Sequence, residues 1–172
     1  MANTYNLISS ITVGSGGAAD IEFTNIPGTY TDLNLIFSTR DDSSQVSNNL
    51  LIKFNGLGDK IDERAVLGTG SSVSNLSNQD SVLLYSYGNG NTSTSNTFGN
   101  GSLYIYNYAS SNSKSTSLDA ITANNSATSA LTVINAGLFK SSSAITSITL
   151  IPYNFANFLQ YSSVDLYGIS NA

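Results

Sequence analysis

SAITSITLIP (residues 143–152) and QYSSVDLYGI (residues 160–169) are the two segments whose pattern decides the fold class. In the first, an isoleucine and Leu150 alternate with serine and threonine; in the second, a valine and Leu166 alternate with polar residues and tyrosine. Successive side chains of a β-strand point to opposite faces, so this period of two predicts two strands that each bury one face in a core. We predict that the two strands turn back on each other.

The same alternation recurs along the rest of the chain. The runs are separated by turn signals such as Pro27-Gly28 and Asn55-Gly56, and no window of helical length keeps apolar residues at helical spacing. These features predict an all-β fold, an antiparallel β-sandwich with a jelly-roll-like arrangement, as a single domain over residues 1–172. Besides the two segments quoted above, strands are expected at residues 5–13, 19–23, 33–37, 50–54, 65–67, 81–85, 98–108, 118–121 and 131–139.

The sequence also predicts the structure of several connections between strands. Residues 5–13 and 19–23 are predicted to form a hairpin around a glycine-rich turn. The aromatic connection at residues 153–158 is too apolar for a freely solvated loop, so part of it is expected to pack under a sheet edge. Polar surface loops are predicted at residues 40–49, 68–80 and 88–96, the last two of them mobile.

A low charge content limits the partners of the chain. Only 10% of the residues are charged, and the polar surface is built from Ser, Asn and Thr. A net charge of −5 with six Lys and Arg residues argues against a nucleic-acid partner, because such affinity comes largely from clustered basic side chains. The apolar runs are far shorter than the roughly 20 residues of a membrane span. We therefore expect neither nucleic acid nor a membrane as partner, and synthesis without a cleaved signal peptide.

The inventory of reactive side chains argues against an enzyme. The chain contains no histidine and no cysteine, so it lacks the usual general base near neutral pH and the commonest thiol nucleophile. A pair of carboxylates can hydrolyse a glycosidic bond without histidine. The acidic residues that stand close together match no catalytic motif in their spacing; they are Asp41, Asp42, Asp59, Asp62 and Glu63.

The same acidic residues are the candidates for a metal site. Oxygen ligands at short spacing suit Ca²⁺, but no segment resembles an EF-hand loop, and residues 59–64 mix charges of both signs in a way that favours local ion pairs. The glycines at residues 14–17 and 88–90 lack the Gly-Lys-Ser/Thr of a phosphate-binding loop, which favours turns. The sequence therefore predicts no metal and no cofactor.

The feature that we single out as a candidate site is a tyrosine stripe. Tyr104, Tyr106 and Tyr108 share one parity of a predicted strand whose other face carries Leu103 and Ile105. The stripe is either a second packed face inside the sandwich or an aromatic patch that contacts a subunit partner or sugar rings, since tyrosine combines apolar area with a polar tip.

Several segments, taken together and in order, resemble a group of small virion proteins of tailed bacteriophages. They are YNLISS (5–10), IPGTYTDL (26–33), IKFNG (52–56), YNYA (106–109), AITSITL (144–150) and DLYGI (165–169). The similarity runs from the first predicted strand to the last. It implies a structural protein of the virus particle, exposed on its outer surface and made in the host cytoplasm, and it implies no catalytic residue.

Two positions on the particle are compatible with this resemblance. A tail fibre needs an attachment region or stalk, whereas this chain enters its first predicted strand within the first few residues, which favours a capsid decoration protein that binds the major capsid protein. Few charges protect the predicted sheet edges, so we expect a homotrimer with the tyrosine stripe at or near the subunit contact. The alternative is a tail-fibre or receptor-binding module whose tyrosines and Asn-rich loops contact glycans of the host surface.

Overall fold

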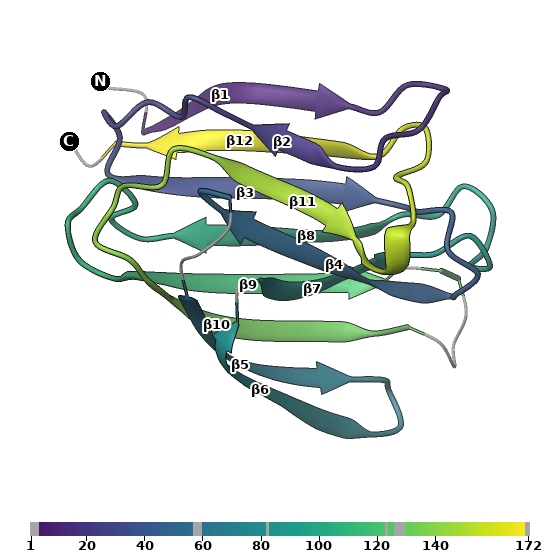
Figure 1. Ribbon diagram of the computed structural model, residues 1–172. Coiled ribbons are helices and arrows are strands. Elements are labelled where there is room, and N and C mark those ends of the chain that lie inside the picture. Colours follow the sequence, from purple (N-terminus) through teal and green to yellow (C-terminus); the bar gives the residue numbers. More distant parts are fainter. Residues whose placement is uncertain (1–3, 57–59, 82, 123, 126–129, 171–172) are drawn as a thin grey trace.

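The computed structural model describes residues 4–56, 60–81, 83–122, 124–125 and 130–170, and they form an antiparallel β-sandwich. An eight-stranded sheet in the order β1-β12-β3-β8-β9-β10-β5-β6 packs face to face against a four-stranded sheet in the order β2-β11-β4-β7 (Figure 1). The predicted all-β class with an antiparallel β-sandwich is confirmed. The elements are β1 (Tyr5–Thr12), β2 (Ile21–Phe23), β3 (Asp32–Thr39), β4 (Ser47–Phe54), β5 (Lys60–Gly68), β6 (Val73–Ser81), β7 (Leu84–Asn89), β8 (Gly99–Ile105), β9 (Lys114–Thr122), β10 (Thr132–Lys140), β11 (Ile148–Pro152), the 3₁₀ turn η1 (Tyr153–Phe155) and β12 (Ser163–Ile169).

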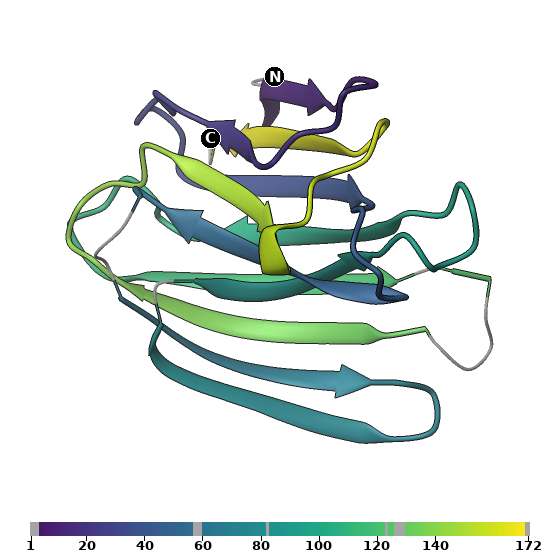
Figure 2. The same cartoon turned by 45° about the vertical axis from the view of Figure 1, so that its right-hand side comes forward.

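The chain crosses repeatedly between the two sheets. Strands β1, β2, β3 and β4 alternate between the large and the small sheet, and β11 and β12 again lie in different sheets. Two hairpins, β5–β6 and β9–β10, pair with each other through β10 and β5 and lengthen the large sheet on one side. Figure 2 shows that β5 and β6 extend beyond the small sheet.

The two C-terminal strands bury the predicted face but do not pair with each other. Strand β11 pairs with β2 and β4, whereas β12 pairs with β1 and β3. The prediction that they turn back on each other is therefore wrong. Leu150 and Leu166 are both fully buried. Two strands in facing sheets can bury their apolar faces against each other without pairing as a hairpin.

The predicted hairpin of residues 5–13 and 19–23 is also wrong, because the two strands lie in different sheets. After β1 the backbone pairs with the segment that leads into β12: Val13 N donates to Ser162 O at 2.8 Å, and Ala18 N donates to Phe158 O at 3.1 Å. These bonds carry the chain across the end of the sandwich, so β2 arrives in the other sheet, beside β11.

Strand β6 lies where the sequence predicted a polar loop at residues 68–80. Most of its side chains are exposed on both faces, because β6 lies at the edge of the large sheet beyond the cover of the small one. It therefore lacks the apolar alternation that identifies a half-buried strand. Its pairing with β5 is regular from Gly68↔Val73 to Glu63↔Asn78.

The core lies between the two sheets. Leu33, Leu35, Leu103 and Ile105 of the large sheet and Ile52 of the small sheet are fully buried. The rings of Phe54 and Phe139 meet edge to face across the core, with centroids 5.2 Å apart. The aromatic connection contributes as expected in part, since Phe158 is buried whereas Tyr153 and Phe155 are exposed.

Candidate interaction surfaces

The structure divides the predicted tyrosine stripe between two environments. Strand β8 ends at Ile105, and Asn107 adopts a left-handed backbone with φ of 47°, a conformation that asparagine tolerates better than most residues. This turn breaks the alternation. Tyr104 and Tyr106 lie on the outer face of the large sheet, whereas Tyr108 has an exposed fraction of 0% and belongs to the core.

Tyr5 of β1 and Tyr167 of β12 lie on the same face as Tyr104 and Tyr106. We call these four side chains the tyrosine cluster. The ring centroids of Tyr104 and Tyr106 are 4.5 Å apart, and those of Tyr5 and Tyr167 are 6.0 Å apart. Asn34 of β3 connects the two pairs: it stands in register between Tyr167 and Tyr104, and its Nδ2 donates to the Tyr5 hydroxyl at 3.5 Å. The sequence could not show this cluster, because its members come from three separate segments of the chain.

The buried carboxylate of Asp32 holds Tyr104 of the tyrosine cluster in place. Asp32 accepts the Tyr104 hydroxyl at 2.8 Å and the backbone N–H of Asn107 at 2.7 Å. Burial, and then the hydrogen bond and charge of Asp32, raise the pKa of Tyr104 well above its usual range. The Tyr104 ring is therefore a neutral hydrogen-bond donor in a fixed orientation.

Exposed apolar side chains continue across the outer face of the large sheet. One row of register partners runs Ile36, Ser102, Asp119, Ile134 and Val66 across five neighbouring strands. The Ile36, Ile134 and Val66 side chains of this row have exposed fractions of 43%, 64% and 53%. The small sheet lies on the opposite face of the large one (Figures 1 and 2), and no described element covers the outer face.

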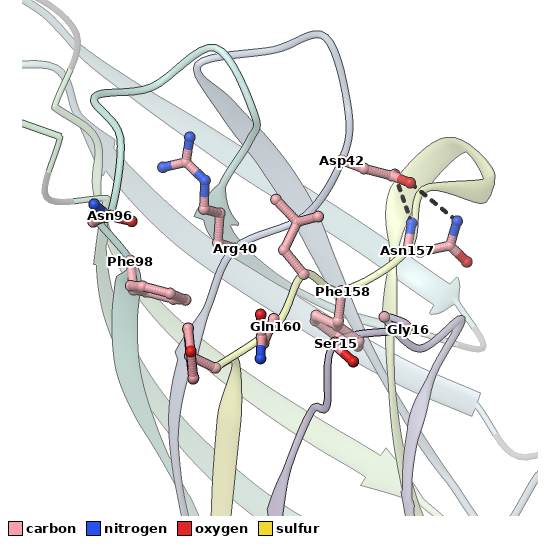
Figure 3. Close-up of a pocket in the computed structure, with 12 residues that line it drawn as sticks. Ser15, Gly16, Arg40, Asp42, Asn96, Phe98, Asn157, Phe158 and Gln160 are labelled. Atoms are coloured by element: carbon pink, nitrogen blue, oxygen red, sulfur yellow. Dashed lines mark hydrogen bonds between the residues drawn. The ribbon is translucent and has the colours of Figure 1, made fainter.

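A second surface feature is a groove of about 520 Å³ at the other end of the sandwich, where β1 ends and β12 begins. In Figure 3, Asn96 and Phe98 stand on one side, Asp42 and Asn157 on the other, and Gln160 between them. We call it the end groove. It is lined by Ser15, Gly16, Gly17, Arg40, Asp42, Asn96, Phe98, Asn157, Phe158, Leu159, Gln160 and Tyr161.

The segment at residues 157–161 forms the floor of the end groove, and backbone hydrogen bonds tie it to a neighbouring segment on each side. Leu159 N donates to Arg40 O at 2.8 Å, and Tyr161 N donates to Val13 O at 3.0 Å. Gly17 has φ of +70°, and a Cβ there would lie 2.9 Å from the carbonyl oxygen of Phe158, so only glycine fits this close approach. Tyr161 itself has φ of 72°, a conformation that costs a non-glycine residue about 1–2 kcal/mol.

One wall of the end groove is a loop that folds around the buried guanidinium group of Arg40. Arg40 has an exposed fraction of 6%, and its guanidinium donates to the carbonyl oxygens of Asn91, Ser93, Thr94 and Thr97 at 2.8–3.1 Å. The polar segment predicted as a mobile loop at residues 88–96 thus begins inside β7 and then wraps Arg40. Sequence reasoning missed this site, and its signal was a single arginine at the start of a polar segment.

The acidic residues do not converge. Asp59 lies outside the described residues. Asp62 pairs with Lys140 of β10 at 2.8 Å, and the hydrogen bond from Lys140 lowers the pKa of Asp62. Among the described residues 60–64 no ion pair forms within the segment itself. Glu63 is buried and accepts hydrogen bonds from Asn78, Asn135 and the backbone of Tyr85.

The other two acidic residues lie at the end of β3. Asp41 is buried, which raises its pKa, and Asp42 is exposed in the end groove. Within the described part of the chain, no group of three or more acidic side chains could hold a metal ion.

Comparison of the chain with protein-family models, curated proteins and solved structures gave no match. Of the described elements, none is a helix long and apolar enough to cross a bilayer.

Proposed function

We propose that the chain is a non-enzymatic structural protein of a bacteriophage particle, a capsid decoration protein that binds the major capsid protein on the outer head surface. The observation that carries this proposal is the outer face of the large sheet, where exposed apolar side chains such as Ile36 lie on the same face as the tyrosine cluster. Large exposed apolar areas mark interaction sites, and tyrosine is enriched in protein interfaces. The sequence resemblance described above supplies the virion context.

The strand order supports a jelly-roll core. Without the hairpins β5–β6 and β9–β10, the sheets reduce to β1-β12-β3-β8 facing β2-β11-β4-β7. Two four-stranded sheets with this alternation of strands are the arrangement of the eight-stranded jelly roll, which occurs in viral capsid and lectin domains. This support is an analogy of fold, and many functions share one fold. The two hairpins enlarge the face that we assign to partner contacts.

The proposal includes a homotrimer in which the tyrosine cluster lies at the subunit contact. Edge strand β1 carries no charged residue, and uncharged edges are prone to pair with other chains unless they are covered. Tyr5 opens this strand and belongs to the tyrosine cluster. A contact centred on the cluster would bury both the aromatic area and the edge of the sheet.

We expect Tyr106→Asp to dissociate the trimer. Tyr106 has an exposed fraction of 44%, so the change is tolerated in a free subunit but leaves an unpaired carboxylate in a contact. Loss of a buried tyrosine anchor weakens association by about 2 kcal/mol or more, or roughly 30-fold. Sedimentation at micromolar concentration measures this effect.

Tyr153→Asp is the matched control, because Tyr153 has an exposed fraction of 43% but lies in η1, away from the tyrosine cluster. It should leave the trimer intact. A monomeric wild type, or a folded Tyr106→Asp protein with an unchanged oligomeric state, would exclude this contact.

The position on the particle is tested by counting copies of the chain in purified virions. A decoration protein should be present in numbers comparable with the major capsid protein. A few copies per particle would instead favour the tail-fibre or receptor-binding alternative, and absence from particles would overturn the virion role.

A further inference from the structure

We propose that the end groove binds an uncharged sugar through a stacked aromatic ring and the carboxylate of Asp42, without a metal ion. This ligand site is separate from the outer sheet face to which the particle contact was assigned. The tyrosine cluster includes the first residue of β1 and side chains at the far end of β8, whereas the groove is formed by the loops that follow β1 and precede β8. Both surfaces can therefore be occupied at once.

The chemistry of the groove matches a sugar ring. A pyranose presents an apolar face of C–H groups and a rim of hydroxyls, so it needs an aromatic surface beside planar groups that donate and accept hydrogen bonds. The groove supplies Tyr161, which is 67% exposed, and the half-buried Phe98. Its exposed amides are Asn96, Asn157 and Gln160. Few convergent polar groups on an aromatic lining are typical of small-molecule sites, and 520 Å³ lies within their range of roughly 300–1,000 Å³.

Asp42 is oriented before any ligand arrives. Its Oδ1 accepts the backbone N–H of Asn157 at 2.7 Å, and its Oδ2 accepts Asn157 Nδ2 at 3.1 Å (Figure 3). An ionised carboxylate has about four acceptor positions, so it can still accept two neighbouring hydroxyl groups of a sugar. Such charge-assisted hydrogen bonds are stronger than neutral ones.

The backbone of the groove also presents its aromatic ring at a fixed place. Tyr161 adopts a left-handed conformation, and its N–H donates to Val13 O. A bulky residue held in such a conformation, with its ring exposed, is a pointer to function, because the core gains nothing from it. A preorganised site loses less entropy on binding.

The charges of the groove disfavour an anionic ligand. The Asp42 carboxylate repels phosphate, sulfate and carboxylate groups. The Arg40 guanidinium would attract them, but it is buried and donates to the carbonyl groups of its loop. No set of three acidic ligands for a cation occurs among the described residues. Among ligands without a negative charge, a polyhydroxylated neutral molecule fits the exposed amides and the aromatic rings of the groove.

The test is an NMR titration of the ¹⁵N-labelled protein with glucose, galactose, mannose and N-acetylglucosamine, each at millimolar concentration and with EDTA present. We expect at least one of these sugars to shift the amides of residues 40–42, 96–98 and 157–161 and to leave those of the tyrosine cluster unchanged. Sialic acid and glucose 6-phosphate should bind more weakly than neutral sugars. Tighter binding of either acid, or no shift with any neutral sugar, overturns the proposal.

Two variants separate binding from folding. Tyr161→Gly removes the ring but relieves the left-handed strain, so it should keep or raise the melting temperature while binding falls at least tenfold. Asp42→Asn should weaken binding about tenfold, because the charge-assisted acceptors are lost. Unchanged affinity in both variants would also overturn the assignment. Tyr106→Asp should leave sugar binding unchanged, so failure of the sugar site and failure of the trimer are distinguishable.

Discussion

Tyr108→Ala should lower the free energy of unfolding by about 3–5 kcal/mol, the range for large aromatic side chains removed from a core. Tyr108 has an exposed fraction of 0%. Its hydroxyl donates to the carbonyl oxygen of Pro27 and accepts the backbone N–H of Tyr30 at 3.4 Å. Burial also raises the pKa of this hydroxyl. The substitution leaves a cavity and removes the partner of a backbone carbonyl in the turn before β3.

Two further variants divide this effect into its parts. Tyr108→Phe keeps the ring and removes only the hydrogen bonds, so it should destabilise by about 1–2 kcal/mol. Tyr106→Ala, two residues away in an exposed position, should change the free energy of unfolding of the dissociated subunit by no more than about 0.5 kcal/mol. Urea unfolding followed by far-UV circular dichroism, at one protein concentration, measures all three. Equal losses in Tyr106→Ala and Tyr108→Ala would contradict the division of the tyrosine stripe.

The alternation in the sequence identified most strands but not their neighbours. Leu150 and Leu166 are buried as their spacing predicted, because the period of two depends only on the strand itself. Which strand lies beside β11 or β12 depends on where the connection runs. The hydrogen bonds between residues 13–18 and 158–162 decide this, and they join segments too far apart in sequence for any local pattern to reveal.

The candidate sites were predictable only in part, because they too depend on contacts between segments that are far apart in the sequence. Tyr104 and Tyr106 were identified from their strand, whereas Tyr5 and Tyr167 joined them only when β1 and β12 came beside β3. Tyr108 was predicted to share a face with Tyr104 and Tyr106, but one left-handed residue, Asn107, puts its side chain on the core side. Strand β6 escaped notice because a strand exposed on both faces has no apolar period.

Arg40→Ala should lower the free energy of unfolding by about 3 kcal/mol or more. The guanidinium makes five hydrogen bonds to the segment from Asn91 to Thr97, four to carbonyl oxygens and one to the Ser93 hydroxyl at 3.2 Å. Hydrogen bonds to charged groups contribute about 1.5–3 kcal/mol each, and buried acceptors left unpaired lose a similar amount. These contributions are not additive, so we expect a loss well below their sum.

Arg40→Lys tests whether the shape of the side chain or its charge matters. A guanidinium spreads five donors in a plane, whereas an ammonium is a compact charge with three. Lysine therefore cannot satisfy acceptors on both sides of the Arg40 head group, and about 2 kcal/mol should be lost. The matched control is Arg64→Lys, because Arg64 is exposed and donates to the carbonyl oxygens of Glu63 and Asn78; its loss should stay below about 1 kcal/mol.

Amide hydrogen exchange locates the effect within the fold. Asn91 N donates to Ser43 O at 2.9 Å and Thr92 N to Gln45 O at 3.2 Å, so these two amides report whether the loop stays closed. In Arg40→Lys they should exchange faster, while amides in the centre of β3 change less. Because the same loop carries Asn96 and Phe98 into the end groove, sugar binding should fall with it. If Arg40→Lys is as benign as Arg64→Lys, the loop is held by its own turns, and Arg40 does not organise this end of the sandwich.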